Sequence, residues 1–164
     1  MISCTFEDKG TAKLRHVTVN ALVIKDGKVL LGKRGAHNDG KPLLEAGKWA
    51  LIGGFLSRDE TVEQALKREI KEESGWKVNN LQLLRIKDSP DRPAEDRQNV
   101  EFIYLAEAIN KTSKRDEEFS KLEWFSLDNL PPKDKMAFDH WDDLAIYKNF
   151  LKSNLSLPII GKYI

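Results

Sequence analysis

Acidic side chains with helical spacing stand out in the segment GFLSRDETVEQALKREIKEESGW, residues 54–76. On a helical wheel, at about 100° per residue, one stripe must face the protein interior because its residues are apolar: Val62, Ala65, Leu66 and Ile70. Glu69 and Glu73 fall inside this stripe, and Glu72 falls at its edge. The three carboxylates are therefore expected to point inward or along a cleft, where their spacing lets them converge.

Carboxylates in these positions need a counter-charge. Like charges repel, acids in the last turns of a helix oppose the helix dipole by ~0.3–1 kcal/mol each, and burial adds several kcal/mol. Arg68 supplies one positive charge against three negative ones. Mg²⁺ or Mn²⁺ binds carboxylate oxygens readily and supplies two. The pattern therefore favours a metal site on a helix, and the competing interpretation is a solvated acidic helix end.

The residues before this helix favour the metal site. A short buried strand is expected over residues 48–52, and it runs into Gly53 and Gly54. A bare glycine backbone can present a carbonyl or an amide group to a ligand. A loop then leads into the acidic helix, and many phosphate-handling sites share this strand–loop–helix order.

The same segment resembles the signature of the Nudix hydrolases, G-x5-E-x7-R-E-U-x-E-E-x-G-U, in which U is aliphatic. Eight fixed positions match within 23 residues: Gly54, Glu60, Arg68, Glu69, Ile70, Glu72, Glu73 and Gly75. Trp76 departs from the pattern at the closing position, where it is bulky but still apolar. The order of the expected elements also agrees with the family, so the resemblance covers nearly the whole chain.

The resemblance implies hydrolysis of a nucleoside diphosphate linked to another moiety, with Mg²⁺ or Mn²⁺ required. By their positions in the signature, Glu69, Glu72 and Glu73 are then catalytic, metal-binding carboxylates, and the Gly53 carbonyl is a further ligand. The chemistry accounts for the acids, since bound metal ions neutralise a pyrophosphate and lower the pKa of the attacking water.

The resemblance gives the other signature residues structural roles. Arg68 orients the carboxylates, Glu60 braces the loop before the helix, and Gly54 and Gly75 complete the set. The helical wheel agrees with this division, because Arg68 lies off the buried stripe but beside Glu72.

A carboxylate must also take a proton from the attacking water. Some Nudix hydrolases use a base in the signature, and others use one on a later loop. The later candidates here are Glu117 and Glu118 in SKRDEEFSKLEWF, of which we take Glu118 as catalytic, and Glu101 is a weaker alternative. The competing interpretation of this run is a solvated charge cluster.

Sequence motifs shorter than the signature bear on the identity of the substrate. Pro90 lies fifteen residues after Gly75, a spacing that resembles the ADP-ribose-hydrolysing branch, as do Trp124-Phe125 and Phe138-Asp139-His140. Each has a structural alternative, since a proline shapes loops, aromatic residues fill cores and a histidine can anchor a helix. We therefore expect ADP-ribose or a similar nucleotide sugar. An intact or oxidised nucleoside triphosphate is the alternative, and a dinucleoside polyphosphate or capped RNA is less favoured.

Candidate substrate-binding residues are Arg34, at the end of an expected strand, and Pro90 with Arg92 in a later loop. A solvated surface arginine is the competing interpretation for Arg34 and Arg92. A non-catalytic nucleotide-sensing module is the alternative to an enzyme. We favour the enzyme because every acidic position of the signature is kept and the chain has no residues to spare for a DNA-binding domain.

The elements that must position these residues can be read from local patterns. Residues 16–25 and 28–34 favour strands and flank Asp26-Gly27, a turn typical of a β-hairpin. A helix is expected over 61–75, with Thr61 and Gln64 as a capping box and Gly75 as its stop. Other strands are expected at 77–87, 99–107 and 122–125, loops at 35–47 and 88–98, and a final helix at 134–151. Strands mixed with two helices indicate an α/β or α+β sandwich. The resemblance narrows this to a Nudix-like α/β/α sandwich with a mixed β-sheet, a single domain over residues 1–164.

Composition limits the partners. Lys and Arg number 27 and Asp and Glu 26 in 164 residues, so no broad basic face for nucleic acid or a membrane is expected. Cys4 is the one cysteine, and no secretory signal or membrane span is visible, so we expect a cytoplasmic protein. The partner is then a small-molecule nucleotide. A homodimer is an open expectation, since the apolar tail at 155–164 fits core, interface or a packed end.

Overall fold

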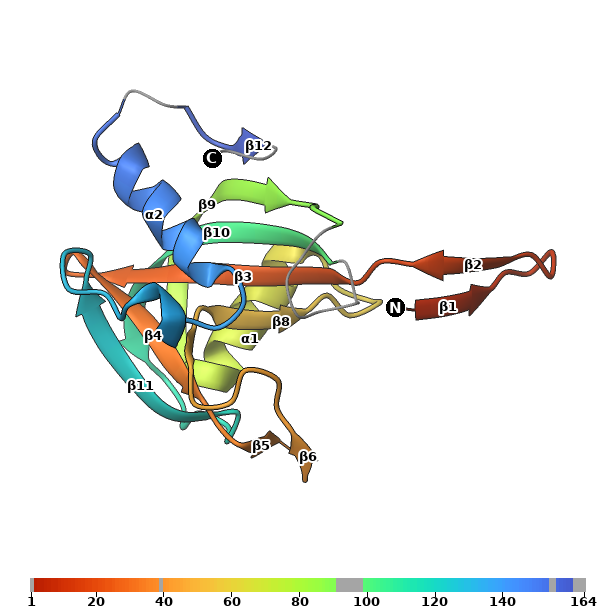
Figure 1. Cartoon of the computed structure of the whole chain (residues 1–164), viewed down its shortest axis with the longest axis horizontal. Coiled ribbons are helices and arrows are strands. Elements are labelled where there is room, and N and C mark those ends of the chain that lie inside the picture. The colour runs from red at the N-terminus through yellow and green to blue at the C-terminus, as the bar shows by residue number, and fades with distance from the viewer. Residues whose placement is uncertain (1, 39, 91–98, 154–155, 161–164) are drawn as a thin grey trace.

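The computed structural model describes residues 2–38, 40–90, 99–153 and 156–160. In that part of the chain, helices α1 and α2 lie on opposite faces of a sheet (Figure 1). The helices are α1 (Val62–Ser74), α2 (His140–Phe150) and the 3₁₀ helix η1 (Lys133–Lys135). The strands are β1 (Ile2–Thr5), β2 (Thr11–Leu14), β3 (Val17–Lys25), β4 (Lys28–Arg34), β5 (His37–Asn38), β6 (Lys41–Pro42), β7 (Trp49–Ala50), β8 (Ile52–Phe55), β9 (Trp76–Lys87), β10 (Val100–Lys111), β11 (Phe119–Ser126) and β12 (Ile159–Ile160).

The main sheet is mixed. Its strands follow the order β11-β4-β3-β10-β9-β12, and the short strands β7 and β8 pair with β4 and β3. β3 runs parallel to β10 and β9 parallel to β12, whereas the other pairs are antiparallel. The expected α/β sandwich with a mixed sheet is therefore confirmed.

Each face of the sheet carries its own core because side chains alternate along a strand. On β3, Val19 and Ala21 face the cluster that contains Leu66 of α1. Leu22 faces the other cluster, which contains Leu144 of α2. The three layers follow from this alternation.

Helix α1 begins and ends where its residues predict. The Thr61 hydroxyl accepts a hydrogen bond from the Gln64 N–H, and the Gln64 side chain accepts one from the Thr61 N–H. Gly75 ends the helix at φ +75°, and a Cβ there would lie 2.2 Å from the Ser113 carbonyl oxygen. Glycine fits because it tolerates a positive φ and has no Cβ.

Two expected elements differ in the structure. The strand expected over 48–52 is split, and β8 continues through Gly53 and Gly54 as a partner of β3. The final helix begins at His140 rather than 134, since the Ala137 N–H donates to the Trp49 carbonyl and Phe138 adopts φ +53°. Pairing with β7 holds this segment out of the helical conformation.

The structure also contains elements that local patterns did not indicate. β1 and β2 form a hairpin that extends away from the main sheet (Figure 1). The expected loop 35–47 contains the β5–β6 ladder, and β10 continues to Lys111. In the apolar tail, β12 pairs with β9. No helix in the described part of the chain is long and apolar enough to cross a membrane.

The packing of α1 predicts the effect of a truncation. Leu66 is fully buried in the core on the α1 face, so Leu66→Ala should lower the free energy of unfolding by about 2–5 kcal/mol. Lys67→Ala, on the exposed side of the same helix, is the control and should change it by no more than about 0.5 kcal/mol. Urea denaturation measures both, and equal effects would contradict this packing.

Candidate active site

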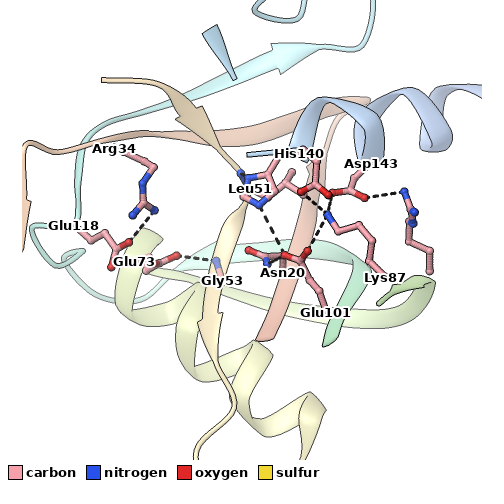
Figure 2. Close-up of polar contacts among 12 residues, drawn as sticks. Asn20, Arg34, Leu51, Gly53, Glu73, Lys87, Glu101, Glu118, His140 and Asp143 are labelled. Carbon is pink, nitrogen blue, oxygen red and sulfur yellow. Dashed lines mark hydrogen bonds and ion pairs between the residues drawn. The ribbon is translucent and has the colours of Figure 1, made fainter. Parts of the chain in front are cut away.

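A cavity of about 260 Å³ lies between α1, β8, β3 and the segment before α2. One end is acidic and is lined by Arg34, Gly53, Gly54, Glu69, Glu73 and Glu118. The other end is lined by Thr18, Asn20, Asn99, Glu101, Phe138 and His140. Figure 2 shows Arg34, Glu118, Glu73 and Gly53 on one side and the group around Glu101 on the other.

Glu73 is the most deeply buried acid of α1, with 2% of its surface exposed. Its carboxylate accepts a hydrogen bond of 2.8 Å from the Gly53 N–H. Burial raises the pKa of Glu73 well above its ordinary value, the charges of Glu118 and Glu69 raise it further, and the Gly53 N–H opposes the shift. The protein therefore holds this carboxylate where its negative charge is unfavourable.

Glu69 also faces the cavity, and Gly54 makes room for it. A Cβ at Gly54 would lie 2.6 Å from Oε1 of Glu69, so any other residue would displace the carboxylate. Burial raises the pKa of Glu69, whereas the hydrogen bond from Arg68, 2.8 Å long, lowers it. Both glycines thus contact an acid of α1, Gly53 through its N–H and Gly54 through the absence of a side chain.

Glu72 does not join the other two. Its side chain is 52% exposed, it bonds to Arg68 at 3.0 Å, and it does not line the cavity. The expectation that all three carboxylates converge is therefore wrong for Glu72 in this conformation. Its position at the edge of the stripe lets it remain in water beside Arg68. Among the described residues, no group of three His, Cys, Asp or Glu side chains is assembled to hold a metal ion.

Arg68 connects the loop before α1 to these acids. Its guanidinium donates to Glu60 at 2.7 and 3.0 Å and to the Phe55 carbonyl at 3.1 Å, as well as to Glu69 and Glu72. Glu60 also accepts from the Ser57 N–H at 2.8 Å. These are the contacts that bracing the loop and orienting the carboxylates require.

Glu118 reaches the cavity from a distant part of the sequence. It lies just before β11, and its carboxylate is 3.1 Å from the guanidinium of Arg34 at the end of β4. Arg34 also donates to the Leu44 carbonyl at 2.8 Å and lies over the Phe138 ring. Glu117 does not line the cavity. The structure thus brings Glu118 and Arg34 together with Glu69 and Glu73.

Of the remaining substrate candidates, only Pro90 belongs to the described residues. Pro90 is exposed and does not line the cavity. Arg92 lies outside the described residues. The expectation that Pro90 contacts the substrate has no support in this conformation.

The other end of the cavity contains residues that local sequence patterns did not indicate. Thr18 and Asn20 come from β3, Asn99 immediately precedes β10, and all three are buried. For Thr18 and Asn20, the sequence signal was the presence of polar residues at alternate positions of an otherwise apolar strand, VTVNALVI. Glu101, considered above as a base, lies at this end and contacts Lys87 and Asn20 rather than the acids of α1.

Lys87 joins this end to α2. Its ammonium group is 2.8 Å from Glu101 and 2.9 Å from both Asp139 and Asp143. Burial raises the pKa of Asp143, and the charge of Lys87 opposes the shift. His140 lies in the same group and accepts a hydrogen bond of 3.1 Å at Nδ1 from the Leu51 N–H.

The comparisons with known proteins point in one direction. A family model described as NUDIX domain matches residues 14–145. The ADP-ribose pyrophosphatase of Methanocaldococcus jannaschii is 39% identical over 124 residues, which cover 76% of this chain and 68% of the relative. The oxidized purine nucleoside triphosphate hydrolase of Mus musculus is 32% identical over 130 residues, covering 77% of each chain. The crystal structure of a MutT NUDIX hydrolase from Burkholderia pseudomallei has a TM-score of 0.67 at 32% identity, covering 81% of this chain and 98% of that one.

The contacts of Glu60 predict a pH-dependent contribution to stability. Hydrogen bonds from Arg68 and from Ser57 lower the pKa of Glu60 from 4.5 to about 2. The ionised group therefore stabilises the fold above pH 4.5, and this contribution is lost as the pH falls towards 2. We expect Glu60→Gln to be less stable than the wild type at pH 7, by a margin that narrows at about pH 3.5.

Urea denaturation at the two pH values measures this margin. Glu63→Gln is the matched control, since Glu63 is an exposed acid on the first turn of α1. A margin for Glu60→Gln that stays constant with pH, or equals that of the control, would show that these hydrogen bonds contribute nothing.

Proposed function

The chain belongs to the Nudix hydrolase family, and from this premise we propose that it hydrolyses the pyrophosphate bond of ADP-ribose or a similar nucleotide sugar with Mg²⁺ or Mn²⁺. The observation that carries this proposal is the acidic end of the cavity, where Glu69, Glu73 and Glu118 lie together beside Arg34. An anionic substrate needs both a positive side chain and a means to neutralise these carboxylates.

The donors at this end suit a hard divalent cation. Glu69 and Glu73 offer only oxygen atoms, and burial raises the pKa values of both, with a further increase from the charge of Glu118. We propose Glu69 and Glu73 as ligands, with the Gly53 carbonyl. Glu72 would join by exchanging its contact with Arg68 for the cation, which its exposed side chain allows. When bound, the metal neutralises the diphosphate and acidifies the attacking water.

The protein side chains supply the rest of the proposed chemistry. Glu118 acts as the base that takes the proton of the attacking water, since its carboxylate lies at the cavity beside the acids of α1. Arg34 binds a phosphate oxygen of the substrate, with its guanidinium held by the Leu44 carbonyl and the Phe138 ring. Arg68 orients Glu69, which lines the cavity, and holds Glu72 until that contact is exchanged for the cation.

ADP-ribose is the first choice because the archaeal relative named ADP-ribose pyrophosphatase is 39% identical to this chain. An oxidised purine nucleoside triphosphate is the second candidate, favoured by the mouse relative, which is 32% identical with 77% coverage of both chains. Both substrates place a purine nucleotide next to the bond that is cleaved. The acidic end of the cavity would therefore support hydrolysis of either substrate.

Removing one charge at the acidic end tests the assignment. We expect Glu73→Gln to reduce kcat for ADP-ribose by at least about 100-fold, because the amide can still accept from the Gly53 N–H but does not bind a divalent cation well. The melting temperature should stay the same or rise, since the neutral amide removes the penalty that raises the pKa of Glu73. Chromatography of AMP release and thermal melting measure the two effects.

The control for this variant is Glu63→Gln, which changes an exposed acid of the same helix and should leave kcat unchanged. Calorimetric titration with Mn²⁺ in the absence of substrate should show binding to the control and at least tenfold weaker binding to Glu73→Gln. Full Mg²⁺-dependent turnover by Glu73→Gln would contradict the proposed metal site.

We also propose that residues 1–164 form one domain and that the protein is located in the cytoplasm. We further propose that two copies of the chain associate through the β1–β2 hairpin. The hairpin exposes Ile2, Phe6 and Leu14, and an isolated two-stranded hairpin is only marginally stable in water. Burying this apolar surface against a second copy would stabilise it. The presence of a single cysteine, Cys4, agrees with a reducing compartment.

Sedimentation velocity tests the dimer. The wild type should sediment as a dimer at micromolar concentration, and Leu14→Ser should shift it towards the monomer. Lys13→Ser, which changes a neighbouring exposed residue on the same strand, is the control and should not. A wild-type monomer under these conditions would contradict the association.

A further inference from the structure

Polar side chains form the end of the cavity that lies away from the proposed metal site. Thr18 and Asn20 come from β3, and Asn99 lies immediately before β10. Glu101 comes from the start of β10 and His140 from the start of α2. Each of the five is more than nine-tenths buried. The hydrolysis proposed above uses none of them. Buried polar groups are unfavourable unless they are hydrogen-bonded, so this end of the cavity requires its own explanation.

One oxygen atom on each of two of these side chains lacks a hydrogen-bond partner among the described residues. Thr18 Oγ1 and Asn99 Oδ1 are buried and have no hydrogen-bond partner among the residues that the structure describes. Both residues line the cavity. The oxygen of Asn99 is an acceptor, and the hydroxyl of Thr18 can accept or donate. A ligand that brings N–H donors into this end of the cavity would satisfy them.

The Glu101 carboxylate is held by two protein groups. Asn20 Nδ2 donates to Oε1, and the ammonium group of Lys87 lies 2.8 Å from Oε2. Lys87 is itself fixed by Asp139 and Asp143 on the α2 side. A carboxylate offers about four acceptor sites, so Glu101 can accept from a ligand in addition to these protein groups.

His140 provides a donor next to this acceptor. Its Nδ1 accepts a hydrogen bond from the Leu51 N–H, so in the neutral ring the proton is on Nε2. Nε2 lies 3.9 Å from Glu101 Oε1, which is too long for a hydrogen bond. Figure 2 shows the two side chains converging from α2 and β10. The Phe138 ring, 5.5 Å from the His140 ring, adds a flat apolar surface to the same wall.

A purely structural role accounts for only part of this arrangement. The ion pairs of Asp143 with Lys87 and Arg85 fasten α2 to the sheet. They do not explain why Thr18 and Asn99 present oxygens at the cavity that have no partner in the described part of the chain. They also do not require the donor of His140 to lie next to the acceptor of Glu101.

We propose that this end of the cavity binds the adenine base of the substrate and recognises its amino edge. The 6-amino group donates to Glu101 and Asn99, the ring nitrogen beside it accepts from His140 Nε2, and Phe138 contacts the face of the ring. The proposal rests on the proposed function and makes it more specific, because the diphosphate then lies at the end of the cavity that Arg34 and the acids of α1 line. Glu101 and His140 are specificity-determining residues in this arrangement.

Substrate analogues test the recognition without altering the protein. The wild type is assayed with ADP-ribose and with the analogue in which hydrogen replaces the 6-amino group. We expect kcat/KM for the analogue to be at least tenfold lower, because the buried acceptors are left without a donor. Equal kcat/KM values would overturn the recognition but leave the proposed function intact. Failure to cleave either compound with Mg²⁺ would instead count against the proposed function.

Variants test which residues recognise the amino group. The measured quantity is kcat/KM for ADP-ribose divided by kcat/KM for the analogue without the 6-amino group. Glu101→Gln should reduce this ratio at least fivefold, since a neutral amide is a weaker acceptor for the amino group. His140→Gln is the second variant, in case the loss of the Glu101 charge prevents folding, and it should reduce the ratio as well. Asp142→Asn, an exposed position on α2 that pairs with Lys133, is the control and should keep the wild-type ratio.

The ratio distinguishes recognition from support of the fold. A residue that only stabilises α2 would lower kcat/KM for both substrates equally and leave the ratio unchanged. That outcome in both Glu101→Gln and His140→Gln would overturn the proposal. Calorimetric binding of AMP and of the corresponding 6-hydrogen monophosphate to the Glu73→Gln protein should show the same preference without turnover.

Discussion

Arg68 binds Glu60, Glu69 and Glu72 together, while the Gly53 N–H binds Glu73, and these contacts hold the acids of α1 beside β8. Without them, several carboxylates would repel one another at the end of a helix whose dipole already disfavours negative charge. The two kinds of contact differ in consequence. Arginine leaves its carboxylates accessible to an exchange of partners, whereas the peptide N–H keeps Glu73 buried and fixed in place. The acidic end is thus organised by the protein itself and still has negative charge to be neutralised.

The close approach of β8 to its neighbours makes this arrangement possible. Gly53 adopts φ +151°, and a Cβ there would lie 2.1 Å from the Val19 carbonyl oxygen. A Cβ at Gly54 would meet the Glu69 carboxylate instead. Two adjacent glycines therefore let one strand pair with β3 on one side and contact the acids of α1 on the other. A larger residue at Gly53 would clash with the backbone of β3, and one at Gly54 would displace the Glu69 carboxylate.

The two faces of the sheet contribute different chemistry to one cavity. The α1 face provides carboxylates that suit a metal ion, and the α2 face provides a buried network in which Lys87 pairs with both Glu101 and Asp143. Because β3 and β10 are adjacent and parallel, Thr18 lies opposite Glu101 in the register. The segment before α2 adds Phe138 and His140 to the same wall. A substrate with a charged diphosphate and a polar, flat base matches this division.

Local patterns in the sequence determined the parts of this protein that depend on near neighbours in the chain. The capping residues Thr61 and Gly75 set the ends of α1, and the helical period placed Glu69 and Glu73 on its buried face, because both effects act within a few residues. Alternating apolar residues likewise indicated the central strands and the α/β class. The helical period placed Glu72 at the edge of the stripe. At that position the direction of its side chain depends on contacts with water, Arg68 or the cavity, which the period does not specify.

Tertiary structure alone decided which distant residues meet. Arg34 and Glu118 are 84 positions apart, and Asn20 and Glu101 are 81 apart, so no local pattern relates them. The late start of α2 at His140 also follows from a tertiary contact, since pairing with Trp49 keeps Ala137 out of the helix. Local spacing therefore fixed the acids of one helix, whereas the partners that complete the cavity depend on the register and order of strands, which single residues do not encode.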